Sequence, residues 1–160
     1  MLEQYYPPAA FYFSVAVLPS PASAPPRTSA DASFQEVSGV KAEFAVEEVV
    51  EGGENRFAHR LPQRSKYPNL VLKRGIVTKG SFLADWVAKT LGSAMSTPIV
   101  TQNLQVSLLN EKGGPITAWR FVNAYPIRWE IAALNSQDNK VLVETLEFSY
   151  NFFEQTNPNG

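Results

Sequence analysis

Hydrophobic and polar residues alternate with a period of two along most of the chain, which is the pattern of β-strands. Residues 11–18 predict a strand that is largely apolar on both faces, so we expect protein on either side of it. A second β region extends over residues 34–50, where Gly39 predicts a bulge or a bend. The alternation resumes over residues 69–76. The first half of the chain is therefore predicted to be mainly extended.

One segment repeats its apolar residues with the period of a helix instead. The repeat predicts a single α-helix over about residues 81–94, with about three to four turns. Ser81 or Gly80 is expected to cap its start, and Gly92 limits its end. Because a lone amphipathic helix cannot build a core by itself, we expect it to cover one open side or end of a β structure. The apolar stripe consists of Phe82, Leu83, Trp86, Val87, Thr90, Leu91 and Ala94.

The last third of the chain again predicts strands at short spacing, with a hairpin loop at residues 110–115 and a long strand over residues 140–153. Many short strands with one helix predict a mainly β fold, an antiparallel β-barrel or sandwich with one packed α-helix. The predicted core is drawn from the apolar faces of the strands and from the helix stripe. Its residues are Phe44, Phe82, Trp86, Leu91, Leu104, Val106, Trp119, Phe121, Trp129, Leu146 and Phe148.

Several segments have the composition of loops or extended arms. Residues 19–33 are rich in Pro, Ser and Ala, and residues 51–55 have the glycine-rich chemistry of a turn. Residues 56–68 predict a polar, basic connection interrupted by proline. We expect residues 1–160 to form one domain, with an extended N-terminal segment at residues 1–10.

The composition of the chain excludes some classes of function for this protein. The 14 Lys and Arg residues nearly balance the 15 Asp and Glu residues, and this balance argues against a direct nucleic-acid site. Charged residues make up 18% of the chain, against about 25% in average globular proteins. Either self-association covers part of the surface, or the chain is a monomer with a neutral polar surface. Without a long apolar run or a basic leader, we expect no membrane-spanning segment and synthesis in the bacterial cytoplasm.

Residues that commonly carry catalysis or bind metals are scarce. His59 is the only imidazole, no second ligand stands at a metal spacing from it, and cysteine is absent. Neither a serine elbow nor a phosphate-binding glycine loop occurs. The sequence therefore predicts no catalytic site, no metal and no cofactor. Aromatic residues such as Trp119 and Trp129 leave an alternative, a stand-alone β-sandwich that binds carbohydrate on an aromatic platform.

Five segments, taken in order along the chain, carry a likeness to a known family. They are YPPAAFYF at residues 6–13, FQEVSGV at 34–40, KYPNLVLKRG at 66–75, WRFVNAYP at 119–126 and ETLEFSY at 144–150. Together they resemble the inner-tube proteins of phage-tail-like contractile injection systems, the family that includes phage T4-type tail tube proteins. The resemblance extends over roughly residues 5–153.

The resemblance implies a structural subunit and not an enzyme. Six copies would close into a ring, and rings would stack into a hollow tube that a contracting sheath drives through a target envelope. The implied partners are further copies of the chain, sheath subunits, baseplate or hub proteins, a tube cap and cargo in the lumen. The particle would be a phage tail or a released phage-tail-like particle, assembled in the cytoplasm. The length of the loop at residues 19–33 leaves a second possibility, a tube-initiating ring on the baseplate.

The resemblance also suggests which segments contact neighbouring copies. By their position, these are the N-terminal segment at 1–10 and the loops at 19–33, 51–66 and 110–115. The candidate contact residues between subunits and between rings are Tyr5, Tyr6, Pro7, Pro8, Pro19, Pro21, Pro25, Pro26, Arg27, Glu51, Glu54, Asn55, Arg56, Arg60, Arg64, Glu111 and Lys112.

Overall fold

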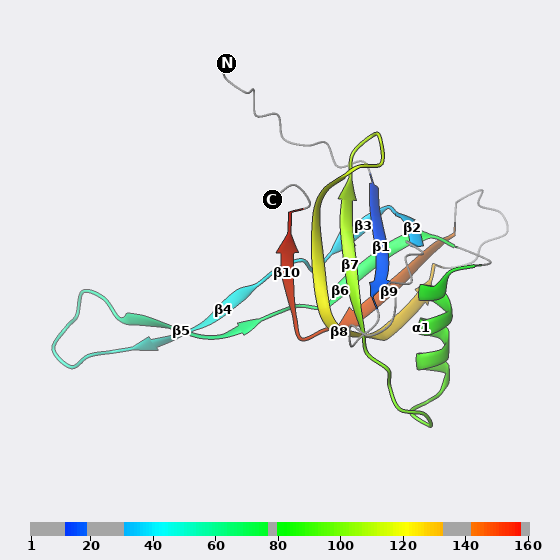
Figure 1. Ribbon diagram of the computed structural model, residues 1–160. Coiled ribbons are helices and arrows are strands. Elements are labelled where there is room, and N and C mark those ends of the chain that lie inside the picture. Colours follow the sequence, from blue (N-terminus) through cyan, green and yellow to red (C-terminus); the bar gives the residue numbers. More distant parts are fainter. Residues whose placement is uncertain (1–11, 19–30, 77–79, 133–141, 158–160) are drawn as a thin grey trace, which may run out of the picture.

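The computed structural model describes residues 12–18, 31–76, 80–132 and 142–157 (Figure 1). These residues form a mainly antiparallel β structure with one α-helix, which confirms the predicted fold class. The elements are β1 (Tyr12–Leu18), β2 (Asp31–Phe34), β3 (Glu36–Ser38), β4 (Glu43–Val49), β5 (His59–Lys66), β6 (Leu70–Gly75), α1 (Phe82–Gly92), β7 (Gln102–Leu109), β8 (Pro115–Ile131), β9 (Val143–Ser149) and β10 (Phe152–Thr156).

The main sheet curls into a barrel. Its strands follow the order β2-β1-β7-β8-β9-β6-β3, and β10 pairs with the first half of β8. The two ends of this order, β2 and β3, are separated in the chain by Gln35 alone. The backbone N–H of Gln35 donates to the carbonyl of Lys73 on β6 at 2.9 Å. Closure in this way removes the edges that β2 and β3 would otherwise present, whereas β10 pairs only with β8 among the described residues and keeps one open edge.

The hydrophobic core fills the barrel and extends under α1. Trp86 of the helix stacks on Phe148 of β9, with ring centroids 5.7 Å apart. The buried strand residues alternate as the period of two requires, because every second side chain of a strand points inward. The core is made of Val15, Val17, Phe34, Leu70, Leu72, Leu83, Trp86, Val87, Leu104, Val106, Phe121, Ala124, Leu146 and Phe148, and Phe82 and Trp119 pack against it while partly buried.

Helix α1 begins at Phe82, directly after the N-cap residue Ser81, whose hydroxyl accepts a hydrogen bond from the backbone N–H of Ala84 at 3.1 Å. The sequence predicted a core position for Leu91, and this prediction is wrong, because its side chain is 36% exposed. The buried residues of the helix, Leu83, Trp86 and Val87, lie in its first two turns. A periodic apolar stripe thus continues past the part of the helix that meets the barrel.

Two segment boundaries differ from the predicted ones. Residues 31–33 were expected in the loop that starts at residue 19, yet they belong to β2. The single strand expected over residues 140–153 is divided between β9 and β10 by a break at Tyr150 and Asn151. The break shifts the alternation by one residue, so that Phe153 packs against the core and Phe152 is 39% exposed.

An aromatic cluster lies where β9 turns into β10. The ring of Tyr150 contacts Phe121 edge-on at a centroid distance of 4.9 Å, and its hydroxyl donates a hydrogen bond to the carbonyl of Gly39 at 3.4 Å. Burial, together with the smaller effect of the neighbouring Tyr67, raises the pKa of Tyr150 to about 12 from its ordinary value of 10.0. The folded protein therefore holds this proton more tightly than the unfolded chain does.

We expect alkali to weaken the fold through this residue. Between about pH 10 and about pH 12 the unfolded chain releases the Tyr150 proton while the folded chain retains it, so stability is complete below pH 10 and falls as the pH rises. Urea unfolding at a series of pH values measures the slope. Tyr150→Phe is the control, because the phenylalanine variant has no proton to lose there. Equal slopes for the two proteins would contradict the prediction.

Candidate subunit interface

A two-stranded hairpin made of β4 and β5 projects away from the barrel, on the side opposite to α1 (Figure 1). The strands are antiparallel, with Glu43 opposite Lys66 and Val49 opposite His59. In the part of the chain that the structure describes, neither strand pairs with any other strand. An isolated two-stranded ribbon is marginally stable in water at best. The hairpin therefore has the form of an element that another molecule completes.

The hairpin exposes apolar side chains to solvent. Phe44 is 65% exposed, Val50 is 76% exposed and Phe57 is 56% exposed. Exposed large apolar side chains gathered on one projecting element mark a candidate interaction site in a soluble protein. The hairpin surface consists of the exposed apolar residues Phe44, Val46, Val49, Val50, Phe57 and Leu61.

The hairpin corrects two sequence predictions. Phe44 was predicted in the core, but it lies on the projecting β4. Residues 56–68 were predicted as a connection, but they contain the strand β5. The error at Phe44 arises because alternation shows that residues share a face and does not show what covers that face. The error at β5 has another cause. Every residue of this strand is exposed, so its sequence lacks the apolar alternation that normally marks a strand.

Some of the candidate contact residues lie on the hairpin, some lie in the turn between β7 and β8, and the rest lie outside the described residues. Glu51, Glu54, Asn55 and Arg56 form the tip of the hairpin, and Arg60 and Arg64 lie on β5. Glu111 and Lys112 are exposed in the turn between β7 and β8. The remaining candidates lie outside the described residues, and they are Tyr5, Tyr6, Pro7, Pro8, Pro19, Pro21, Pro25, Pro26 and Arg27. Contact by any of these residues stays a prediction.

Ion pairs order the tip and the root of the hairpin. At the tip, Arg56 donates hydrogen bonds to both carboxylate oxygens of Glu54, and this pairing lowers the pKa of Glu54. At the root, the ammonium of Lys41 lies 2.7 Å from the carboxylate of Glu43, and the resulting hydrogen bond lowers the pKa of that carboxyl. Both pairs join residues two positions apart, so they stiffen the chain locally without attaching the hairpin to the barrel.

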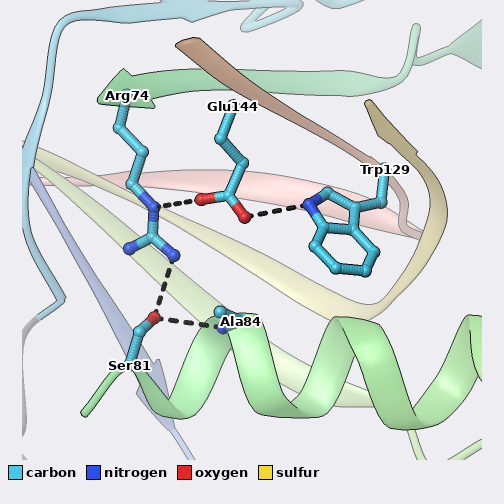
Figure 2. Close-up of polar contacts among 5 residues, drawn as sticks. All are labelled: Arg74, Ser81, Ala84, Trp129 and Glu144. Atoms are coloured by element: carbon cyan, nitrogen blue, oxygen red, sulfur yellow. Dashed lines mark hydrogen bonds and ion pairs between the residues drawn. The ribbon is translucent and has the colours of Figure 1, made fainter. Parts of the chain in front are cut away.

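A second polar feature is buried between the barrel and the start of α1 (Figure 2). The guanidinium of Arg74 donates to a carboxylate oxygen of Glu144 at 2.8 Å and to the hydroxyl of Ser81 at 2.9 Å. The other oxygen of Glu144 accepts from the indole N–H of Trp129 at 2.9 Å. Arg74 also lies over the ring of Phe34, 5.0 Å from its centroid. We call Arg74, Ser81, Trp129 and Glu144 the buried cluster.

The sequence prediction missed the buried cluster, and it placed Trp129 in the core. That placement is wrong, because Trp129 is 42% exposed and turns its indole N–H toward Glu144. A signal was present: Arg74 has the same parity as the inward residues Leu70 and Leu72, and Glu144 has that of Leu146. A charge at an inward position of a strand indicates a buried partner.

The buried cluster joins β6, β8 and β9 to the N-cap of the helix. The side chains of Arg74 and Glu144 are 1% and 3% exposed. Among the described residues, no buried side-chain nitrogen or oxygen lacks a hydrogen-bond partner. A closed and saturated set of polar groups fixes positions and leaves no group directed at a ligand. We therefore assign it the role of holding α1 against the barrel.

A cavity of about 420 Å³ opens between α1 and the segment that leads into β7. Trp86 and Val100 line it, and the indole N–H of Trp86 donates to the carbonyl of Val100 at 3.1 Å. The described residues hold no group of three acidic or histidine side chains suited to a metal ion. No helix among them is long and apolar enough to cross a membrane. The hairpin surface thus remains the most prominent candidate for contact with another molecule.

Comparison with protein families identifies the chain. The model of a family described as T4-like virus tail tube protein gp19 matches residues 9–154. The chain belongs to this family of tail tube proteins. The match confirms the resemblance that the five sequence segments indicated. The protein is accordingly a structural subunit of an inner tube, in a phage tail or a related contractile injection particle.

Solved structures agree with the family. This tail tube protein is 30% identical to a chain in the cryo-EM structure of the anti-feeding prophage baseplate, covering 95% of this chain and 97% of that one with a TM-score of 0.78. A chain of the PVC sheath–tube complex in the extended state is 20% identical over 96% and 94% of the two chains, with a TM-score of 0.76. Hcp1 from Flavobacterium johnsoniae shares the fold at 14% identity over 92% and 96%, with a TM-score of 0.55. No curated protein matches the chain.

The comparisons give no support to the carbohydrate-binding alternative. The structure also bears on the aromatic platform, because Phe121 and Phe148 are buried in the barrel and Trp119 packs against the core. These three rings stabilise the tube subunit from within. Trp129, the other residue named for the platform, is 42% exposed, and its indole N–H donates to Glu144.

Proposed function

We propose that six copies of this tail tube protein close into a ring and that the rings stack into the hollow tube. The observation that carries the proposal is the hairpin: a pair of strands with open edges and exposed apolar side chains, held away from the barrel. The related baseplate chain comes from a structure with 6-fold symmetry, which supports a ring of six.

The geometry favours head-to-tail contacts. The hairpin and the barrel are different surfaces of one subunit, so a hairpin that contacts the neighbouring subunit forms a heterologous interface. Such an interface closes into a ring when the rotation per copy divides a full turn. Strand edges that would be a hazard in a monomer become joining surfaces, since each gains backbone hydrogen bonds from its neighbour.

The structures in which the relatives occur support a wider assembly. The PVC relative comes from a sheath–tube complex, and other relatives come from a sheath and tube terminator and from a tube-terminating cap. We propose sheath subunits, baseplate or hub proteins and a cap as the partners of this chain. We also propose that residues 1–160 act as one tube-subunit domain, made in the cytoplasm, which transmits force as a rigid body and catalyses no reaction.

A second candidate is a tube-initiating ring on the baseplate. The specific observation in its favour is the identity to the baseplate chain, 30% against 20% for the chain of the sheath–tube complex. Deletion of the gene from its cluster separates the candidates. Loss of an initiator leaves baseplates without tubes, whereas loss of the main tube subunit leaves baseplates that still carry an initiating ring.

The ring itself is tested by changing the hairpin surface. We expect Phe44→Ser together with Leu61→Ser to abolish ring formation while changing the free energy of unfolding by about 0.5 kcal/mol per site or less, because both side chains are exposed in the single chain. Light scattering checks the mass, which should be six times 17.7 kDa for the unchanged protein, and urea unfolding checks the fold.

The core substitution Val106→Ser is the opposite control, since it should unfold the barrel and thereby lose the ring. Rings that persist in the hairpin variant with their stability unchanged would rule out the hairpin surface as the interface. A single-chain species of the unchanged protein at high concentration, even with baseplates present to nucleate it, would refute the proposed ring.

A further inference from the structure

The charges of the hairpin are sorted by strand. Strand β4 carries acidic side chains and no basic one, and β5 carries basic side chains and no acidic one. All of these side chains lie on exposed residues. The hairpin in Figure 1 is thus an acidic strand beside a basic strand, each with an open outer edge. The acidic residues of β4 are Glu43, Glu47 and Glu48, and the basic residues of β5 are Arg60, Arg64 and Lys66.

Pairing within the hairpin uses this sorting only weakly. Glu43 faces Lys66 across the ladder, and Lys66 is a lesser cause than Lys41 of the lowered pKa of Glu43. The closest contact between the charges of the two strands joins Arg60 to Glu48 at 4.0 Å, with side chains 70% and 67% exposed. Exposed pairs of this kind contribute little to stability. Among the described residues, Arg64 and Lys66 have no carboxylate within 4.0 Å. Glu43 takes its close partner from Lys41, outside the strand.

The two faces of the hairpin carry the same polarity. Residues opposite each other in a sheet share a face, so Glu48 and Arg60 lie on one face and Glu43 and Lys66 lie on the other. A strand added at either edge would therefore meet charges of a single sign on both faces. The acidic edge fits a basic strand, and the basic edge fits an acidic one.

We propose that hairpins of neighbouring copies pair side by side, with β4 of one copy against β5 of the next, and that the charge sorting dictates this order. The inference rests on the proposed ring and states how its contacts are specified. Copies related by rotation keep their hairpins in one orientation, so β4 and the neighbouring β5 run antiparallel and can continue the hydrogen-bond ladder. Each junction then places carboxylates opposite ammonium or guanidinium groups.

The same charges oppose the competing arrangement. A two-fold dimer formed through hairpin edges would set β4 against β4 or β5 against β5. Like charges directly opposite each other in a sheet are destabilising. The hairpin therefore favours head-to-tail growth around a ring over a closed pair of copies, and it combines attraction to the correct edge with repulsion of the wrong one.

Charge reversal by strand tests the proposal. One variant carries Glu43→Lys, Glu47→Lys and Glu48→Lys and has two basic edges, and a second carries Arg60→Glu, Arg64→Glu and Lys66→Glu and has two acidic edges. Each variant alone should need about tenfold or more protein to form rings, because like charges then meet at every junction as well as within each hairpin, where Glu43 faces Lys66 and Glu48 faces Arg60. An equimolar mixture should form rings at a clearly lower concentration than either variant alone, since the variants can alternate around an even-numbered ring and only the like charges within each hairpin then remain. The variant with all six changes should also assemble alone.

Sedimentation velocity and native mass spectrometry follow ring formation and composition, and circular dichroism checks that each variant folds. A matched control reverses three exposed glutamates on the barrel, Glu36, Glu130 and Glu154, and should assemble as the unchanged protein does. Single-strand variants that assemble normally would overturn the inference while the ring stands, and so would a mixture that fails to recover. An unchanged protein that forms no ring would instead overturn the proposed function.

Discussion

Glu144→Ala is expected to destabilise the barrel by about 3–5 kcal/mol, the usual cost of leaving one partner of a buried ion pair alone. The substitution leaves the guanidinium of Arg74 buried at 1% exposure without its carboxylate. It also removes the acceptor of the indole N–H of Trp129. Because Arg74 donates to Ser81 as well, the change should loosen the first turn of α1. Urea unfolding measures the loss.

The double variant Arg74→Met with Glu144→Leu is the informative control. Replacing both charges by apolar side chains of similar size removes the cost of burying them, so the double variant should be more stable than Glu144→Ala by about 2 kcal/mol or more. If the two variants unfold at the same urea concentration, the unpaired buried charge of Arg74 is not the cause of the stability lost in Glu144→Ala. Protection of the α1 amides from hydrogen exchange reports separately on the attachment of the helix.

Gly39→Ala is expected to have an effect of similar size, about 3 kcal/mol or more, from overpacking and from backbone strain together. Gly39 has a φ angle of +87°, and a Cβ atom there would lie 1.9 Å from the carbonyl oxygen of Asn69. That oxygen belongs to the backbone just before β6, so a side-chain rotation cannot relieve the clash. The turn between β3 and β4 would have to move, and the hairpin with it.

Gly53→Ala is a matched control for this prediction. Gly53 has a φ angle of +98°, but nothing lies within 4 Å of the position of its Cβ. Its substitution should cost about 1–2 kcal/mol at most, from the left-handed backbone alone. The difference between the two variants in urea unfolding measures the clash with Asn69. Equal losses for both would show that the close approach at Gly39 relaxes without cost.

Gly39 also shows how closely the barrel and the hairpin are coupled. The backbone N–H of Lys41 donates to the carbonyl of Gly39 at 2.9 Å, and Tyr150 donates to the same carbonyl from the aromatic cluster. The residue that turns the chain out of β3 is therefore held by the barrel and sets where β4 starts. A defect here should disturb assembly as well as folding.

Local patterns in the sequence were enough to predict the class of fold and the helix. The alternation that includes Leu104 and Val106 predicted a strand that the barrel buries, and the spacing of Leu83, Trp86 and Val87 predicted the buried stripe of α1. These patterns are informative because all the residues that form each pattern lie within one short segment of the chain. The family resemblance worked in the same way, through ordered segments, and the family match confirmed it.

The tertiary structure alone decided what covers each face. Phe44 and Val106 both stand in alternating segments, yet one is 65% exposed on the hairpin and the other is fully buried. Arg74 and Glu144 are 70 positions apart, and only the pairing of β6 with β9 brings them together. A period in the sequence records which side chains point the same way. What covers that side, whether protein, solvent or another copy of the chain, depends on other strands. Burial and strand pairing are made between segments that are distant in the sequence, and a local period carries no information about them.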